Sequence, residues 1–511
     1  SLAVYKFIAK RIGISVLILW AASLLIFVLT INSGDPLEDL RESNNPNREN
    51  LMQQRSSFMG LDLPWYERYW TWLTGAAKCF IGQCDLGVNR SGQSVNDMLG
   101  QAASATLRLV LAATFLAIFF GIFFGVMSAI RRYTGFDYVV TFLAFTFYSL
   151  PAFVFAVLLK EYGAIRFNDW LADPTISLVT IVIFAGIFAL FVQALVAGGP
   201  KRRAMAAGIS FAIAFGVMEY ISVTRAFLEP TGGLWIEALM GLAGTVLFTG
   251  LFLGFSNKRG FAVVGANAAI MFVIVAACSN MLWEPTWGFL FLILALGIAA
   301  SVGVSYFFGG YARRSVTWAS IWAVFSVWIA IIFDFAARYW STYLPLTQNR
   351  PISTIGSMTP NFQGSHVFWL SFLDSFTHLL LPTISLTLMS IASYTRYTRS
   401  SMLEVLGQDY IRTARAKGLP EHTVITRHAF RNAMLPLLTI IAFDFAGLIG
   451  GAVITETVFG WKGMGELFRT GLAQVDPAPV MAFFLVTGGA AVLMNMVADI
   501  MYAYVDPRIR R

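Results

Sequence analysis

The chain alternates between long apolar runs and shorter polar segments. A helix that crosses about 30 Å of hydrocarbon needs roughly 20 mostly apolar residues. Twelve runs meet this condition, and each is expected to form a helix because a helix satisfies its own backbone hydrogen bonds in lipid. They lie near residues 12–31, 105–130, 136–159, 177–197, 204–223, 235–255, 261–282, 287–308, 316–336, 376–395, 433–455 and 480–504. The predicted fold class is an all-α polytopic membrane protein.

Composition supports this prediction. Of the 511 residues, 57% are hydrophobic and only 13% are charged, whereas soluble proteins average about 45–50% and about 25%. So little charge cannot cover a water-facing surface. The sequence therefore excludes a soluble globular enzyme, a disordered protein and a nucleic-acid-binding module. No nucleic-acid partner is expected despite the net charge of +8.

The basic residues orient the predicted helices. Cytoplasmic loops of membrane proteins are enriched in Lys and Arg. Every second loop carries a basic cluster, and the loops between them are poor in such clusters. The clusters are Arg131-Arg132, Lys201–Arg203, Lys258-Arg259, Arg313-Arg314, the stretch 396–431, and Arg508 with Arg510 and Arg511. This alternation predicts cytoplasmic N- and C-termini, with the run at 12–31 retained as the first transmembrane helix.

One predicted cytoplasmic loop, 396–432, differs from an ordinary connector. Apolar residues recur there at helical spacing, namely Leu403, Leu406, Tyr410, Ile411 and Ala414. Gly418 and Pro420 are expected to end this helix. A second helical piece is expected over 421–431, with Pro436 opening the next span. Such an amphipathic helix can dock another protein, or it can lie on anionic lipid; the residues alone leave both interpretations open.

The same loop resembles a known signature. Residues 409–419 read DYIRTARAKGL and residues 427–436 read RHAFRNAMLP. They resemble the coupling loop of binding-protein-dependent ABC importer permeases, most of all the dipeptide, oligopeptide and nickel branch. Further motifs occur in the same order as in that family: Gly34–Pro36, Gly60–Tyr69, Asp85–Gly87, Ser149–Pro151, Thr455–Phe459, Gly463–Gly465 and Asp506–Arg508. The resemblance therefore covers about 1–160 and 335–511.

The resemblance implies a type I importer permease in a bacterial inner membrane. Such a subunit pairs with a homologous second permease above two ATPase subunits, and an extracytoplasmic substrate-binding protein delivers the peptide substrate. The implied ATPase-coupling residues are Asp409, Tyr410, Arg412, Thr413, Ala414, Arg415, Ala416, Lys417, Gly418 and Leu419. Ala414 and Gly418 would allow close approach, while Asp409, Arg412 and Arg415 would make polar contacts.

The sequence holds no Gly-x-x-x-x-Gly-Lys-Ser/Thr phosphate loop. If ATP drives transport, we expect ATP and Mg²⁺ to bind the partner ATPase chains. We expect no cofactor and no enzymatic activity in this chain.

The chain departs from the usual permease, which has about six spans. Six extra apolar runs fall within 161–336, and an even number leaves the topology of the flanking core unchanged. The insert is either an accessory domain that recruits a partner or lipid, or a peripheral bundle that takes no part in transport. The expected organisation is a first helix (1–31), an outer loop region (32–104), core helices (105–160), an inserted bundle (161–336), a second outer loop (337–375) and the remaining core (376–511).

Few residues outside the loop carry candidate chemistry. Cys79 and Cys84 lie in the first outer loop, where a disulfide can persist. A metal site is not expected there, because no histidine lies nearby in the sequence. Asp444 falls in the middle of a predicted span, where a charge is costly. It either lines the translocation path and attracts a peptide amino group, or is neutralised by an Arg or Lys of another helix.

The leading functional hypothesis is the permease subunit of an ATP-driven importer of short peptides. A nickel or other small-solute importer uses the same machinery, but four histidines make metal cargo less attractive. An ion-gradient-driven secondary transporter is an alternative of another class. It needs paired unwound sites at mid-membrane, for which Asp444 is weak support. A non-transporting membrane scaffold is the last alternative.

Overall fold

The computed structural model describes residues 2–449 and 452–505 of the chain. Its regular elements are helices, and in the described residues the one β-bridge is the isolated pair Val88–Ser94. Eleven helices in this part of the chain are long and apolar enough to cross a membrane, or twelve if one bent pair counts as a single span. The chain is therefore an all-α polytopic protein, as the sequence predicts.

The bent pair is the third expected span. Residues 136–159 do not form one straight helix. α6 (Gly135–Ser149) ends before Leu150-Pro151, and the chain continues into α7 (Ala152–Leu158) and α8 (Arg166–Leu171) at an angle of 100° to α6. Pro151 lacks a backbone N–H and disfavours helical geometry in the residue before it, which explains the break.

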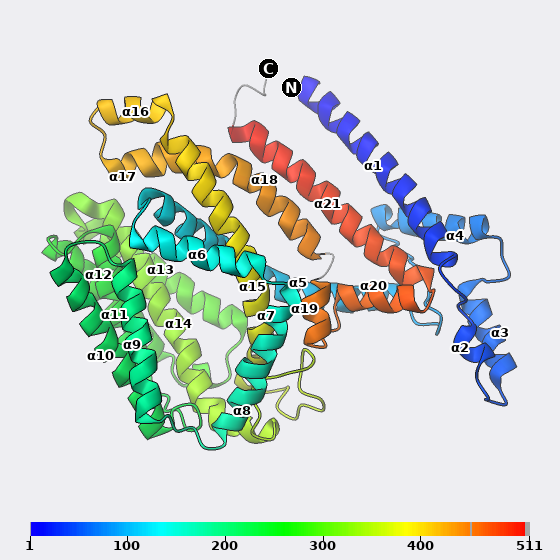
Figure 1. Ribbon diagram of the computed structural model, residues 1–511, viewed down its shortest axis with the longest axis horizontal. Coiled ribbons are helices and arrows are strands. Elements are labelled where there is room, and N and C mark those ends of the chain that lie inside the picture. Colours follow the sequence, from blue (N-terminus) through cyan, green and yellow to red (C-terminus); the bar gives the residue numbers. More distant parts are fainter. Residues whose placement is uncertain (1, 450–451, 506–511) are drawn as a thin grey trace.

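The remaining helices form two groups (Figure 1). The first group is built around α5 and α15, which pack along each other. Its other members are the N-terminal helix, the short helices of the first outer region, and the C-terminal helices. The bounds in this group are α1 (Leu2–Ile31), α2 (Glu38–Arg41), α3 (Arg48–Met59), α4 (Trp65–Ala77), α5 (Val95–Ile130), α15 (Phe368–Leu406), α16 (Asp409–Ala416), α17 (Glu421–Thr423), α18 (Phe430–Ile449), α19 (Val453–Val458), α20 (Met464–Ala473) and α21 (Pro477–Val505).

Small side chains allow α5 and α15 to approach closely. Ala113, Ala117, Gly121 and Gly125 all lie on the buried face of α5. Small residues are the usual means of close helix packing in lipid, because lipid tails are as apolar as large side chains and only close contact favours association.

The second group is the segment expected as an insert. It contains α9 (Leu178–Leu195), α10 (Pro200–Thr224), α11 (Leu234–Phe252), α12 (Lys258–Ala277), α13 (Trp287–Phe308) and α14 (Arg313–Leu346). α11 to α14 share one apolar core, whereas α10 packs mainly on α9. This group meets the rest of the chain mainly at two places, where α9 packs on α6 of the bent pair and α14 packs on α15 of the first group. At the second contact Trp369 stacks on Phe335, with ring centroids 5.2 Å apart.

The irregular segment between α14 and α15 is shorter than the loop expected from the sequence. α14 continues to Leu346 and α15 begins at Phe368, so the irregular segment is 347–367 rather than 337–375. The helical extensions are polar enough to be taken for loop in the sequence, but they are packed: Tyr343 and Leu373 are buried together.

The two ends of the molecule present different helices. α16, the start of α1 and the end of α21 lie at one end, whereas α2, α3 and α8 lie at the other (Figure 1). The loop helix α16, the start of α1 and the end of α21 therefore lie on the same side of the molecule.

Candidate functional site: the loop helix and its links through the core

The loop helix α16 is separate from the helix that precedes it. α15 ends at Leu406, and Gly407 and Gln408 break the chain before α16 begins at Asp409. The expected single apolar face from Leu403 to Ala414 is therefore wrong, because Leu403 and Leu406 belong to α15. Asp409 in the first turn and Arg415 in the last turn both match the sign of the helix dipole.

α16 has one buried and one exposed face. Ile411 and Ala414 are buried in a cluster with Met402 of α15 and with Val424 and Ala433 from the start of the following helix. Ala414 therefore packs inside this chain and is not part of the exposed surface. This packing fixes α16 against the two long helices that flank it.

The other predicted coupling residues lie mostly at the surface. Asp409 and Arg412 are 98% and 77% exposed, with a loose ion pair of 3.7 Å between them. Leu419 is half-buried. The exposed members are Asp409, Tyr410, Arg412, Thr413, Arg415, Ala416, Lys417 and Gly418. Partial burial raises the pKa of the Tyr410 phenol above its ordinary value of 10.0, so this side chain stays neutral at physiological pH.

Gly418 forms the turn after α16. Its φ is +75°, and no other group lies within 4 Å of the position a Cβ would occupy. Beyond the turn, Arg415 donates to the Glu421 carboxylate at 2.9 Å. The turn thus requires a left-handed residue, leaves open space beside it, and is braced by an ion pair.

The second helical piece of the loop is not a distinct helix. α17 leads into a π-helical turn, Val424–Ala429, and then directly into α18. Pro436 lies inside α18 and does not open it, contrary to the expectation from the sequence. The π-helical turn shifts the hydrogen-bond register here, as such turns often do at functional sites.

Asp444 has a partner that the sequence analysis did not consider. It is half-buried on α18 and accepts a hydrogen bond from the hydroxyl of Tyr394 on α15. No ion pair joins it to a Lys or Arg among the described residues. The contact links the two helices that flank α16. A tyrosine in an apolar run is usually interpreted as a packing residue, so the sequence contained no sign that Tyr394 donates to Asp444.

A second polar link lies away from α16, where α19 and α20 pack on α5 (Figure 1). Glu456 is 1% exposed; it accepts hydrogen bonds from the Thr106 hydroxyl at 2.7 Å and the Gly465 amide at 2.9 Å. A Cβ on Gly465 would lie 2.7 Å from the Glu456 carboxylate. The motifs Thr455–Phe459 and Gly463–Gly465 therefore work together, because the glycines leave the space that the buried carboxylate occupies.

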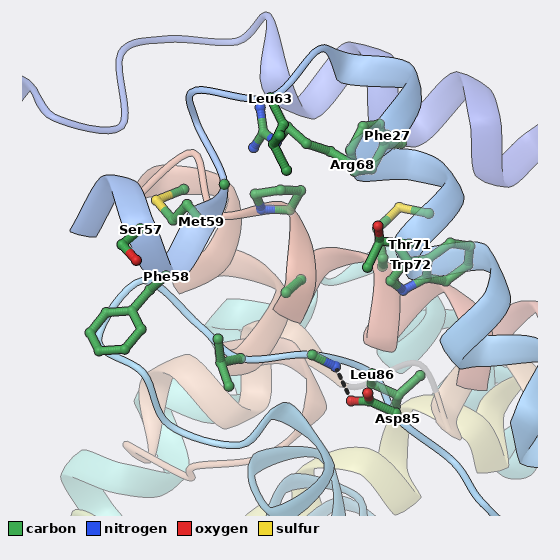
Figure 2. Close-up of a pocket in the computed structure, with 16 residues that line it drawn as sticks. Phe27, Ser57, Phe58, Met59, Leu63, Arg68, Thr71, Trp72, Asp85 and Leu86 are labelled. Carbon is green, nitrogen blue, oxygen red and sulfur yellow. Dashed lines mark hydrogen bonds between the residues drawn. The ribbon is translucent and has the colours of Figure 1, made fainter. Parts of the chain in front are cut away.

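The segment between α1 and α5, together with the end of α1 and the start of α21, lines a pocket of about 300 Å³. Figure 2 shows Ser57, Phe58 and Met59 on one side and Arg68, Thr71 and Trp72 of α4 on the other. Below them Asp85 accepts a hydrogen bond from the Gly87 amide at 3.0 Å. Cys79 and Cys84 form a disulfide just before the pocket-lining residues 85–88. The disulfide closes the turn that leads α4 into the pocket wall.

These features define a multi-pass helical membrane protein with a braced loop helix at one end and a pocketed outer region at the other. Residues 261–511, just under half of the chain, match the model of the family described as "Binding-protein-dependent transport system inner membrane component". The match begins in α12, so it includes part of the segment expected as an insert.

Curated relatives agree with the family. The chain is 41% identical over 155 residues to the oligopeptide transport system permease protein OppB of Mycobacterium tuberculosis, covering 30% of this chain and 47% of the relative. It is 48% identical over 136 residues to the oligopeptide transport system permease protein AppB of Bacillus subtilis, covering 27% of this chain and 43% of the relative. It is 46% identical over 140 residues to the dipeptide transport system permease protein DppB of Escherichia coli K12, covering 27% of this chain and 41% of the relative. The matched part thus spans just under half the length of these relatives.

Proposed function

We propose that this chain is a membrane-spanning permease subunit of an ATP-driven importer that moves short peptides into the cytoplasm. The observation that carries the proposal is α16, a short helix with an exposed charged face and a buried face fixed to α15 and α18. Dipeptide and oligopeptide permeases as relatives support peptide cargo over nickel. A secondary transporter or a scaffold has no use for such a loop helix.

The partners follow from the same proposal. Two ATPase chains would lie beneath the assembly and one would receive the exposed face of α16. A homologous permease would complete the pathway, and an extracytoplasmic binding protein would deliver the peptide. ATP and Mg²⁺ would be held by the ATPase chains.

The proposed orientation places α16 and both terminal helices in the cytoplasm. The basic residues support it, because Arg132 in the turn after α5, Arg202 in the first turn of α10 and Arg314 in the first turn of α14 are exposed where the positive-inside pattern predicts that side. Asp444 remains a candidate for the translocation path. It lies between α15 and α18, where closing of the ATPases would be passed to the core as a change between two discrete arrangements.

The test is peptide-stimulated ATP hydrolysis by the assembly reconstituted with its binding protein. We expect Gly418→Arg to abolish stimulation, because the side chain would fill the open space beside α16. Gly254→Arg is the matched control: Gly254 also has a positive φ, +74°, and no group within 4 Å of its Cβ position. It should keep the wild-type response. Di-, tri- and longer peptides and chelated nickel should be offered separately.

Full activity of Gly418→Arg, or the absence of any co-purifying ATPase, would refute the coupling role of α16. Stimulation by chelated nickel and by no peptide would refute the proposed cargo but keep the coupling.

A further inference from the structure

A second cavity lies where the two groups of helices meet. It has a volume of about 300 Å³ and is bounded by α5, α6, α9 and α15. Its wall is apolar and aromatic, with Phe124, Leu143, Phe147 and Phe191 among the lining residues. Thr395 supplies the one side-chain hydroxyl. A buried water needs two to four polar partners, so this cavity suits a hydrocarbon rather than water.

The cavity opens toward the bilayer. Phe191 is 40% exposed, and Val139 and Val140 are half-buried. The described part of this chain leaves the space unfilled, because the insert meets the core mainly through α9 on α6 and α14 on α15. Lipid tails surround this seam and are the apolar groups available to enter it.

Cations border the cavity at the end nearer α16. Arg131 donates to the Leu195 carbonyl at 2.9 Å, and its guanidinium lies over the Phe136 ring at 5.0 Å from the centroid. Both Leu195 and Phe136 line the cavity. Arg203 donates to the Gln193 carbonyl at 3.2 Å, within the same turn of α9. The two arginines are therefore held at the rim by backbone carbonyls.

The surroundings of this rim are positively charged without compensation. Arg132, Lys201 and Arg202 are exposed beside the two rim arginines. In the described part of the chain, no ion pair joins any of these five residues to a carboxylate. The nearby Asp137 is already paired with Arg399. An occupant with a negative head and an apolar tail would match the rim and the cavity together.

We propose that the cavity holds an acyl chain of an anionic phospholipid whose headgroup phosphate lies on Arg131 and Arg203. Basic pockets between membrane helices on the cytoplasmic side are suited to acidic headgroups. A lipid in this position would fill the seam and join the insert to the core. The proposal is independent of the transported cargo and holds whether or not peptides are imported.

Lipid retention by the purified full-length chain tests the proposal. The chain is exchanged into detergent with equal phosphatidylglycerol and phosphatidylcholine, washed, and analysed by native mass spectrometry. We expect the wild type to retain phosphatidylglycerol in preference to phosphatidylcholine. Arg131→Gln with Arg203→Gln should weaken retention by about fivefold for each charge removed, the contribution of one basic side chain near an anionic surface. Arg313→Gln with Arg314→Gln removes two exposed cations in the insert and should retain lipid as the wild type does.

A cavity-filling variant tests the acyl chain separately. Val140→Phe places extra volume in the cavity from a half-buried position on α6 and should reduce retention without changing any charge. Gly216→Phe is its control, because Gly216 has no neighbour within 4 Å of its Cβ position. Equal retention of both lipids, or retention unchanged in the double arginine variant, would overturn the proposal. So would a photo-crosslinker at Phe191 that captures a protein chain in the native membrane and no lipid.

Discussion

Arg399 of α15 holds Asp137 of α6 in a two-pronged ion pair, although 262 residues separate them. Nε and Nη2 of Arg399 donate to the two carboxylate oxygens at 2.8 and 3.0 Å. Asp137 is 2% exposed and also accepts from the Ser128 hydroxyl and the Tyr133 amide. The pair fixes the bent third span against the helix that leads into α16.

Asp137→Asn should destabilise the chain because it leaves the Arg399 guanidinium without its counter-charge. Breaking a buried pair costs about 3–5 kcal/mol. We expect the low end of that range, since Arg399 keeps 26% of its side chain exposed. Thermal unfolding of the purified chain measures the loss. Arg396→Gln is the control on the same helix, where the guanidinium lies over the Tyr148 ring and forms no ion pair with any residue that the structure describes. Equal melting temperatures for both variants would contradict a structural role for the pair.

Gly465→Ala should also be destabilising, by overpacking. Its Cβ would meet the Glu456 carboxylate at 2.7 Å and the backbone of Val453 at 3.0 Å. Forcing extra volume into a packed site costs about 1–3 kcal/mol. Gly447→Ala on α18 is the control, because nothing lies within 4 Å of its Cβ position. In the same thermal assay, only Gly465→Ala should have a lowered melting temperature. A wild-type melting temperature for Gly465→Ala would mean that the motif glycines serve another purpose.

The apolar pattern predicted the helices better than their ends. Twelve runs were expected, and the described chain has eleven candidate spans plus the bent pair at Pro151. The loop 337–375 was overestimated because Tyr343 and Asp374 look polar in sequence, yet they bond to each other at 3.1 Å inside the fold. Periodicity merged Leu406 with α16 because two residues, Gly407 and Gln408, are too few to interrupt a helical pattern.

Some polar residues inside spans were recognised from the sequence, but their partners were not. Asp444 was recognised as costly, and Tyr394 was not recognised as its donor. Glu237 of α11 is fully buried and was not singled out. Asp499 of α21 forms an ion pair with Arg11 of α1 at 2.5 Å. These pairs join helices that lie from 50 to several hundred residues apart in the chain, and a single sequence holds no record of which helices are neighbours.

The buried carboxyl of Asp476 should give the outer region a pH-dependent stability. Asp476 is 2% exposed and accepts the Arg90 amide at 2.8 Å. Burial raises the pKa of Asp476 above its ordinary value of 3.8, even though Arg90 opposes the shift. The folded state thus holds this proton more tightly than the unfolded chain. The resulting stability is complete below pH 3.8 and is lost as the pH rises through the raised pKa.

Asp476→Asn, which mimics the protonated acid, should remove this dependence. Between pH 3.5 and 7, the melting temperature of the variant relative to that of the wild type should increase as the pH rises. Asp62→Asn, at an exposed outer position, should follow the wild type. Parallel curves for Asp476→Asn and the wild type across the whole range would show that the carboxyl titrates without effect on folding.

The contact between Tyr394 and Asp444 separates two roles for the aspartate. If it links α15 to α18, Tyr394→Phe removes the donor and should weaken coupling by about 1.5–3 kcal/mol, the range for a hydrogen bond to a charged group. Asp444→Asn keeps an acceptor for the hydroxyl and should retain most peptide-stimulated ATPase activity and uptake. If the charge instead attracts a peptide amino group, the ranking reverses: Asp444→Asn loses uptake while Tyr394→Phe keeps it. We expect the first ranking, because the carboxylate is half-buried and held by the neighbouring helix. Uptake of labelled dipeptide into proteoliposomes, beside ATPase activity, decides between them.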